Sequence, residues 1–315
     1  RSRARHSPVP LPPLRLLPLD GTGPEDVVAD GEGRILTGVE DGRILRVDPA
    51  GGPVRTVAVT GGRPAGLHPL PDGALLVCDT ERGLLRIDTE RGTVDVLVAE
   101  VDGEPLRFCS NAVTAADGTV YFTESSRRFG IAHWLGDILE HSGTGRLMRL
   151  SPQGKTEVLL DGLQFANGVV LAPDESQVVV AETGGYRLTR LWLTGDRAGT
   201  SEPLIDGLPG FPDNLSLSPS GLIWTAIAAP RDPVLDFLHR SHPVLRKAVW
   251  ALPDTLRPKP TRTVWAMAVD FAGKIVHDLQ GPHPEFEFVT GVCENAGNLY
   301  LGSLTRKAVG VVKLP

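Results

Sequence analysis

Residues 24–33, PEDVVADGEG, decide the fold because their pattern returns forty positions later as residues 64–73, PAGLHPLPDG. Each copy has a short polar or small start, alternating apolar residues, and a turn that contains Asp and Gly. A β-rich run with a second turn follows, at residues 34–48 in the first copy and 74–88 in the second. Self-similarity at a period of about 40 to 50 residues is typical of the blades of a β-propeller.

Four more copies complete a set of six. They begin at Ser110, Ala166, Asp213 and Val289. The last copy has room for only three strands, so residues 14–19 are expected to supply its outer strand and to join the two ends of the chain. The sequence therefore predicts an all-β fold: one six-bladed β-propeller of four-stranded antiparallel blades over residues 14–315. A flexible, basic and proline-rich arm is expected at residues 1–13.

Two insertions interrupt the period, at residues 127–144 in the third copy and 230–262 in the fifth. The second insertion has a helical pattern over residues 233–252, and the outer strands of its blade are expected at residues 266–270 and 274–278. Insertions on one rim commonly form a binding face. We interpret both as a lid over one end of the central channel, with packing at a remote site as the alternative.

Composition excludes several classes of function. The net charge of −6 and the scattered basic residues give no patch for nucleic acid. Three cysteines lie far apart, without the spacing of a disulfide framework or a zinc site. No apolar run reaches the roughly 18 residues of a membrane span. A cytoplasmic location is slightly favoured, while a trimmed signal or anchor and any oligomeric state are left open.

The starts of the six innermost strands carry polar side chains. Aligned by residue type, these positions are Glu25, Ala65, Asn111, Asn167, Asn214 and Thr290, with Asp213 directly before Asn214. Because innermost strands surround one axis, these side chains are expected to converge. Calcium prefers six to eight hard oxygen ligands, and the absence of His and Cys disfavours softer metals. The ring predicts one Ca²⁺, with Mg²⁺ less favoured and a polar lining of a water-filled channel as the other interpretation.

Ala65 and Thr290 leave one side of this ring without charge, which we interpret as room for a substrate beside the ion. His133, in the first insertion, is expected to face the site and to contact the substrate, with a surface position as the alternative. Glu124 and Glu182 end equivalent strands and are interpreted as solvated strand ends, with a supporting or basic role as the alternative. No serine nucleophile elbow, phosphate loop or dinucleotide fingerprint is present.

Several stretches together resemble the strictosidine synthase-like family. They are residues 23–25, 120–126, 145–147, 165–169, 181–183, 209–214 and 299–303, of which the run PGFPDN at 209–214 is the most specific. The channel of that family is similar to those of the calcium-dependent gluconolactonases, paraoxonases and diisopropylfluorophosphatase. This resemblance implies hydrolysis of esters, lactones or phosphotriesters. It also implies metal ligands at Glu25, Asn111, Asn167 and Asp213, with Asn214 as a further ligand.

Two positions depart from these relatives. Strictosidine synthases use a glutamate on the sixth blade where this chain has Thr290, so condensation of an amine with an aldehyde is disfavoured. Paraoxonases have a histidine where this chain has Ala65.

The leading hypothesis is a calcium-dependent hydrolase of carboxylic esters or lactones. Asp213 would hold the ion and act as base or nucleophile, and Phe211, Thr290 and His133 would bind a small-molecule substrate. The alternative is a non-catalytic propeller with a structural ion and a partner-binding rim.

Overall fold

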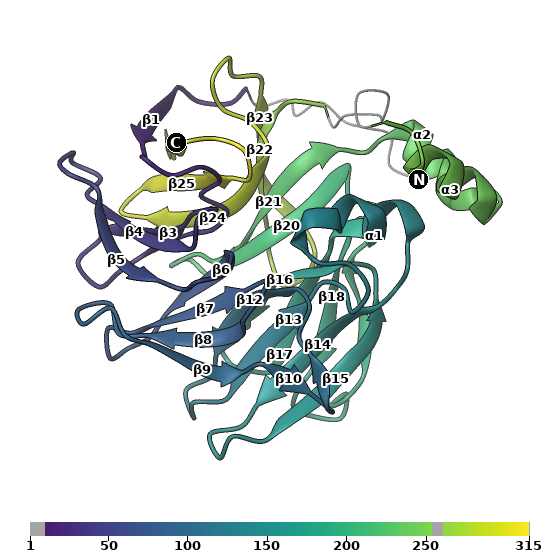
Figure 1. The fold of residues 1–315 in the computed structure, drawn as a ribbon, viewed down its shortest axis with the longest axis horizontal. Coiled ribbons are helices and arrows are strands. Elements are labelled where there is room, and N and C mark those ends of the chain that lie inside the picture. Colours follow the sequence, from purple (N-terminus) through teal and green to yellow (C-terminus); the bar gives the residue numbers. More distant parts are fainter. Residues whose placement is uncertain (1–9, 254–260, 315) are drawn as a thin grey trace.

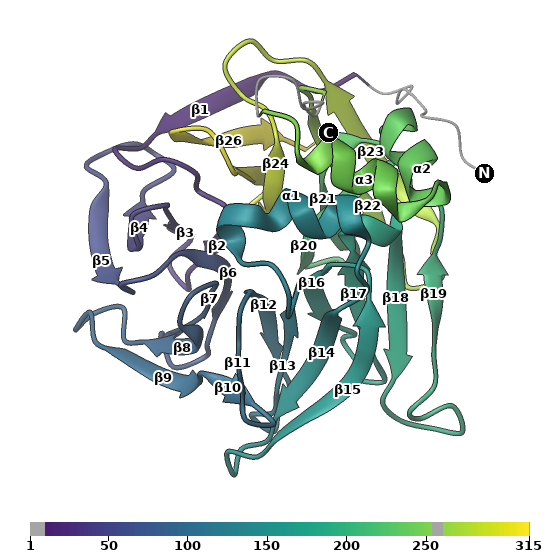
Figure 2. The same cartoon turned by 45° about the vertical axis from the view of Figure 1, so that its right-hand side comes forward.

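The computed structural model describes residues 10–253 and 261–314. In this part of the chain, six antiparallel sheets of four strands each follow one another around a central axis, as Figures 1 and 2 show. A two-stranded ribbon, β10 (Glu100–Val101) with β11 (Glu104–Pro105), lies between the second and third sheets in sequence. The predicted six-bladed β-propeller is confirmed.

The blades are numbered in chain order. Blade one contains β2 (Val27–Ala29), β3 (Ile35–Gly38), β4 (Arg43–Val47) and β5 (Arg55–Val59); blade two contains β6 (Pro64–Pro69), β7 (Leu75–Asp79), β8 (Gly83–Ile87) and β9 (Val94–Val98); blade three contains β12 (Cys109–Thr114), β13 (Val120–Glu124), β14 (Gly145–Leu150) and β15 (Thr156–Leu163). Blade four contains β16 (Ala166–Leu171), β17 (Gln177–Glu182), β18 (Arg187–Trp192) and β19 (Ser201–Ile205); blade five contains β20 (Gly210–Leu217), β21 (Ile223–Pro230), β22 (Val264–Val269) and β23 (Ile275–Gly281); blade six contains β24 (Val289–Asn295), β25 (Asn298–Ser303), β26 (Ala308–Lys313) and β1 (Leu14–Pro18).

The ring closes through the two ends of the chain. Strand β1 pairs antiparallel with β26, with Leu14 opposite Val312 and Pro18 opposite Ala308. The outer strand of blade six therefore comes from the N-terminal side, as the sequence predicts. This pairing protects an edge that would otherwise expose unpaired backbone groups.

Apolar side chains of adjacent blades form the core, because each blade packs against a neighbour on both faces. The second strands show this most clearly: all residues of β7, β13 and β17 are buried, which explains their nearly continuous apolar sequences. The outer strands β5 and β9 contain several exposed residues each. The blades are therefore held together mainly by hydrophobic contact between sheets.

Three second strands end in a buried carboxylate that fixes the preceding loop. Asp79 accepts a hydrogen bond from the backbone N–H of Arg63 at 3.1 Å, Glu124 from that of Arg107 at 2.7 Å, and Glu182 from that of Gln164 at 2.8 Å. The side chains of Glu124 and Glu182 also form ion pairs with Arg146 and Arg187. The interpretation of Glu124 and Glu182 as solvated strand ends is wrong, because both side chains are fully buried.

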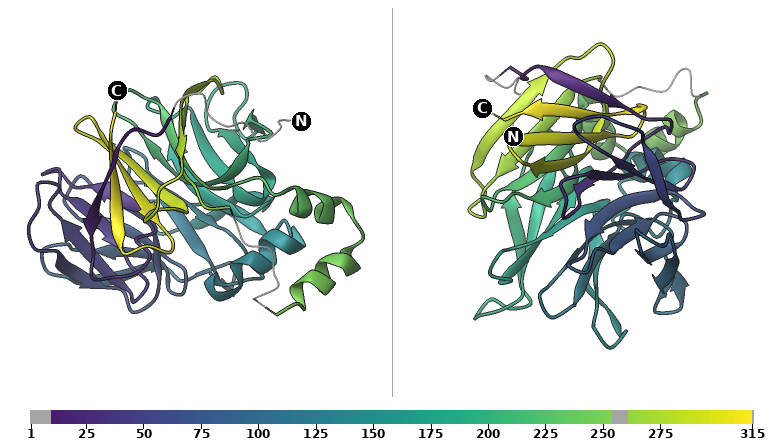
Figure 3. Two further views of the ribbon diagram at one scale, coloured as in Figure 1. Left: turned by 90° about the horizontal axis from the view of Figure 1, so that it is seen from above. Right: turned by 90° about the vertical axis from the view of Figure 1, so that its left-hand side faces the viewer.

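Both insertions are helical. The first contains a short 3₁₀ helix, η1 (Ile131–His133), and α1 (Trp134–Glu140), which the sequence analysis did not predict; a second 3₁₀ turn, η2 (Thr183–Gly185), follows β17. The second insertion contains α2 (Pro233–Arg240) and α3 (Pro243–Trp250) in place of one continuous helix. Asp232 and His242 cap these two helices, and a proline occupies the first turn of each, so that a new helix starts at Pro243. Figure 3 shows α2 and α3 beyond α1 at the rim of the propeller.

Candidate functional site

The start of each innermost strand contributes to two layers of side chains around the channel. Strand pairing defines which residues of the innermost strands are equivalent: Val27, Leu67, Ala112, Val169, Leu215 and Val292. They lie opposite Thr37, Val77, Phe122, Val180, Thr225 and Leu301 of the second strands. The residues two positions earlier form what we call the upper layer: Glu25, Ala65, Ser110, Asn167, Asp213 and Thr290. The residues one position earlier form the lower layer: Asp26, Gly66, Asn111, Gly168, Asn214 and Gly291.

This register corrects the alignment made from the sequence. Asn111 and Asn214 were aligned with Glu25 and Asn167 by residue type, but the structure places them one position further along, in the lower layer. The equivalent of Glu25 in blade three is Ser110. The spacing to the turn glycine contained this information, since Gly33, Gly73, Gly118 and Gly221 each lie eight positions after an upper-layer residue.

Large polar residues and glycines alternate around the lower layer. A Cβ atom on Gly168 would lie 2.2 Å from the backbone N of Leu215, and one on Gly66 would lie 2.2 Å from the carbonyl O of Ser110. Glycine at these positions lets the innermost strands of neighbouring blades approach one another. The chain therefore closes tightly around the axis beneath the upper layer.

Hydrogen bonds occupy most of the polar side-chain groups of the lower layer, whereas the buried Asn214 Nδ2 has no partner. The Asn111 side-chain amide donates to Asn214 Oδ1 at 2.9 Å and to Asp26 Oδ2 at 3.4 Å. Asn111 Oδ1 accepts from the Val169 N–H at 3.3 Å, and Asp26 Oδ2 accepts from the Leu67 N–H at 2.9 Å. Asn111 is consequently engaged at both ends of its amide, which favours a supporting role beneath the site.

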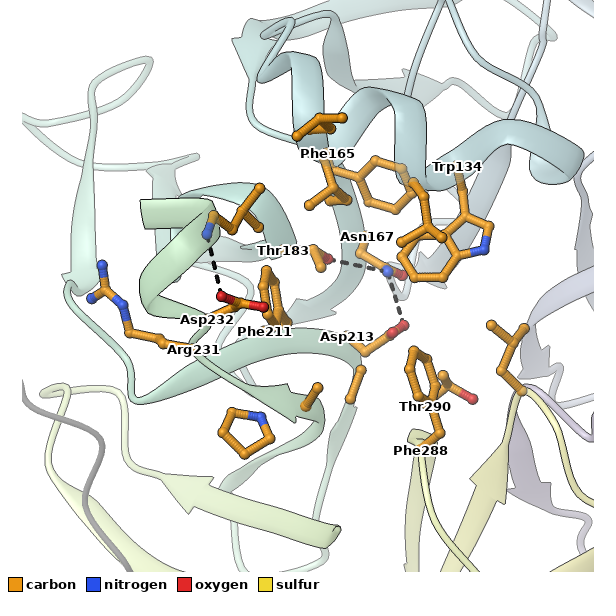
Figure 4. A pocket seen from close by; sticks show the side chains of 18 of the residues that line it. Trp134, Phe165, Asn167, Thr183, Phe211, Asp213, Arg231, Asp232, Phe288 and Thr290 are labelled. Carbon is orange, nitrogen blue, oxygen red and sulfur yellow. Dashed lines mark hydrogen bonds between the residues drawn. The ribbon is translucent and has the colours of Figure 1, made fainter. Parts of the chain in front are cut away.

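The upper layer forms the floor of a cavity of about 280 Å³. Glu25, Asn167, Asp213 and Thr290 line it, and Figure 4 shows Asn167, Asp213 and Thr290 at its base. Asn167 donates to Asp213 Oδ1 at 2.8 Å and to Thr183 Oγ1 at 3.3 Å, while the Thr290 hydroxyl donates to the Glu25 carbonyl at 2.7 Å. The buried Glu25 Oε2 has no hydrogen-bond partner. Such an oxygen is available to a cation.

Burial dominates the electrostatics of this floor. It raises the pKa of Glu25 to about 7, an effect that Arg63 partly opposes, and it raises the pKa of Asp26 to about 7. Burial and the Glu25 charge raise the pKa of Asp213 well above its ordinary value. Carboxyl groups crowded in this way are stabilised in their charged form by a cation between them.

The donor set fits a hard cation. Glu25 and Asp213 offer carboxylate oxygens, and Asn167, whose amide nitrogen donates twice, keeps Oδ1 as an acceptor for a ligand. Among the described residues, no cluster of three or more His, Cys, Asp or Glu side chains has the proximity of a metal site. The cation would therefore depend on amide, hydroxyl and water oxygens in addition to two carboxylates, which fits Ca²⁺ better than a transition metal.

Apolar side chains from both insertions form the walls and roof. Trp134 and Ile138 of α1 and Leu235 and Leu238 of α2 face the cavity, and Phe211, predicted as a substrate-binding residue, also lines it. The aromatic residues Phe108, Phe165 and Phe288 also line it, and Trp134 packs edge-on against Phe288 at 6.1 Å between ring centroids. The cavity is thus polar at its floor and mainly apolar elsewhere, although Arg231 and Asp232 also line it (Figure 4).

His133 lies outside this cavity. Its ring is exposed and packs edge-on against Trp250 at 6.4 Å between centroids. Asp26, Ser110 and Arg63 were not predicted as site residues. Arg63 is buried beside Gly23 and places a positive charge near Glu25, so the side of the ring that was expected to lack charge contains one.

The fold is similar to that of the six-bladed propellers gluconolactonase and regucalcin. A gluconolactonase from Xanthomonas campestris matches with a TM-score of 0.68 and 17% identity, over 96% of this chain and 89% of that one. The calcium-binding protein regucalcin from Agrobacterium tumefaciens matches with a TM-score of 0.65 and 14% identity, over 95% and 91%. At such identities the likeness establishes the fold.

Sequence comparison then identifies the family. Residues 111–196 match the strictosidine synthase model, and residues 11–47 match the strictosidine synthase-like N-terminal model. Adipocyte plasma membrane-associated protein of Rattus norvegicus is 32% identical over 89% of this chain and 80% of its own length. Strictosidine synthase-like protein 10 of Arabidopsis thaliana is 32% identical over 96% and 89%. The chain belongs to the strictosidine synthase-like family, as its residues 209–214 and the other matching stretches indicated.

No helix among the described residues is long and apolar enough to cross a bilayer.

Proposed function

We propose that this chain is a hydrolase of carboxylic esters or lactones that binds one Ca²⁺ at the cavity floor. The observation that carries this proposal is the unpaired, buried carboxylate oxygen of Glu25 beside the buried carboxyl of Asp213, at the base of a cavity with mainly apolar walls. Glu25, Asn167 and Asp213 would hold the ion, with Asn111 and Asn214 supporting them from below. Gluconolactonases share the fold, which supports a lactone or ester substrate.

The ion, when bound, would polarise the substrate carbonyl and stabilise the oxyanion that develops on it. The chain's own residues would do the remaining work. Asp213, which accepts a hydrogen bond from the Asn167 amide, would accept a proton from an attacking water. The aromatic walls would bind the apolar part of the substrate and exclude bulk water from the floor.

Thr290 argues against the condensation reaction of the family's best-known members. It occupies the upper layer of blade six, and its hydroxyl donates to the Glu25 carbonyl at 2.7 Å. A hydroxyl held in this way cannot exchange a proton near neutral pH as a glutamate can. Thr290 instead fixes the backbone that presents Glu25.

Turnover of aryl esters and lactones should require Ca²⁺. We expect activity on a panel of both substrate types to disappear with a chelator and to return when Ca²⁺ is added, because the carbonyl would lose its Lewis acid. Initial rates and calorimetric titration of Ca²⁺ measure the two effects separately. Binding of Ca²⁺ with no turnover across the panel would favour the alternative, a structural ion in a propeller whose rim binds a partner.

The affinity for Ca²⁺ should rise with pH up to about 7. The pKa of Glu25 is raised to about 7, so the folded protein without a cation holds a proton there that the unfolded chain has already lost above its ordinary pKa of 4.5. The stronger binding of this proton in the folded state stabilises the metal-free fold relative to the unfolded chain. This stabilisation is complete below pH 4.5 and is lost as the pH rises through 7. Because the cation must displace this proton, we expect its affinity to fall about tenfold for each pH unit below 7. Titrations at pH 5.5, 6.5 and 7.5 test this, and equal affinities would contradict it.

A further inference from the structure

The helices over the cavity expose an unusual share of apolar surface. Twelve large hydrophobic residues are exposed in the described part of the chain, and six of them lie on or next to these helices: Leu135, Val234, Phe237, Val244, Leu245 and Leu252. Phe237 and Val244 are the most exposed of all, at 64% and 61%. Contiguous apolar surface of this kind usually marks an interaction site.

Each helix of the second insertion has two apolar faces. On α2, Leu235 and Leu238 face the cavity, while Phe237 faces solvent. On α3, Val249 and Trp250 face the cavity, while Val244 and Leu245 face solvent. The inward faces are explained by packing over the cavity. The outward faces, which we call the outer lid face, lack such an explanation.

The charge around the outer lid face is basic. The described residues of this insertion, 230–253 and 261–262, contain five Arg or Lys and two Asp, in a chain whose net charge is −6. Both aspartates serve the insertion itself: Asp232 caps α2, and Asp236 pairs with Arg231 at 3.3 Å. Arg240 and Lys247 are exposed beside Phe237 and Val244 in sequence. Apolar side chains flanked by exposed basic ones are complementary to an anionic lipid surface.

The outer lid face is continuous with the mouth of the cavity. Leu135 and Val234 line the cavity and are also exposed, at 41% and 52%. An amphiphile could therefore pass from the outer face to the interior along apolar side chains. Figure 3 shows α2 and α3 projecting at the rim, where a planar surface can reach them.

We propose that the outer lid face docks on anionic lipid surfaces and that an amphiphilic ester or lactone enters the cavity from them. The docking stands independently, whereas the delivery of a substrate rests on the proposed function. A second copy of the chain fits this face less well, because a two-fold contact would bring Arg240 and Lys247 close to their own copies.

Co-sedimentation with vesicles tests the docking. We expect the protein to bind vesicles of phosphatidylcholine with phosphatidylserine, to bind phosphatidylcholine alone more weakly, and to lose affinity with salt. Phe237→Glu combined with Val244→Glu should weaken binding at least about tenfold, because it removes two inserted side chains and adds two negative charges. The matched control is Val59→Glu with Val96→Glu, which changes two exposed valines, 55% and 46% exposed, on the outer strands of blades one and two. This control should bind as the wild type does.

Two further measurements keep the docking and the catalytic proposal separate. Neither Phe237 nor Val244 lines the cavity, so turnover of a water-soluble ester should be unchanged in that double variant. If no substrate were turned over, the catalytic proposal would fail, but the vesicle-binding experiment would still test the docking proposal. The docking proposal is overturned by a wild-type protein that ignores anionic vesicles, by equal losses in the lid and control variants, or by sedimentation velocity showing a dimer that the lid variant dissociates.

Discussion

Replacing Asp213 with Asn is expected to lower kcat/KM for esters or lactones by about 100-fold or more and to weaken Ca²⁺ binding. The substitution removes one of the two carboxylates at the cavity floor. It also brings a second amide next to Asn167, whose Nδ2 now donates to Asp213 Oδ1 at 2.8 Å. Both a ligand and the proposed base would be lost, so the effect on turnover should exceed the effect on ion binding.

Asp26→Asn is the matched control for this prediction. It is the same chemical change on a buried carboxyl whose pKa is also raised, but Asp26 lies in the lower layer and does not line the cavity. We expect Asp26→Asn to retain turnover within a few-fold while changing stability. Steady-state kinetics, calorimetric titration and thermal unfolding of both variants separate these effects. Equal losses of turnover would show that the two layers cannot be assigned different roles.

The repeat was enough to predict the fold, because each blade carries its own turn and its own buried second strand. The closing strand at residues 14–18 followed from a simple requirement that the last blade have a fourth strand. The helix α1 was missed because its seven residues, with Gly136 in the middle, are too short for a helical period to stand out. Its order comes from tertiary contacts, such as Ser126 and Ser142 donating to the buried Asp137.

The candidate site was predicted in outline and misaligned by one residue. Matching Asn111 to Asn167 by residue type ignored the spacing to the turn, which places Gly118 eight positions after Ser110. The bulge between Cys109 and Ala112 does not account for the error, because blade four has an equivalent one between Ala166 and Val169. Asp26 was overlooked because adjacent strand residues normally point to opposite faces. Near the axis, however, the glycines of alternate blades let both layers converge, and no property of residues 24–33 alone indicates this.

Replacing Arg146 with Met is expected to destabilise the fold by about 3 to 5 kcal/mol. The side chains of Glu124 and Arg146 are 0% and 3% exposed, and Glu124 Oε2 accepts from Arg146 Nε at 2.9 Å and from Nη2 at 2.6 Å. Methionine keeps the volume of the stem but leaves a buried carboxylate with the Arg107 N–H as its remaining partner. The loss reflects an uncompensated buried charge, so Glu124→Gln added to Arg146→Met should restore part of the stability.

Arg149→Met provides the comparison on the same strand. Arg149 of β14 pairs with Glu157 at 2.7 Å, with side chains that are 45% and 48% exposed, so water already compensates both charges. Breaking this exposed pair should cost less than about 1 kcal/mol. Urea unfolding of the two single variants and of the Glu124→Gln, Arg146→Met double variant measures the contrast. Similar midpoints for Arg146→Met and Arg149→Met would mean that the strand-end carboxylates are not what fixes the loops leading into the channel.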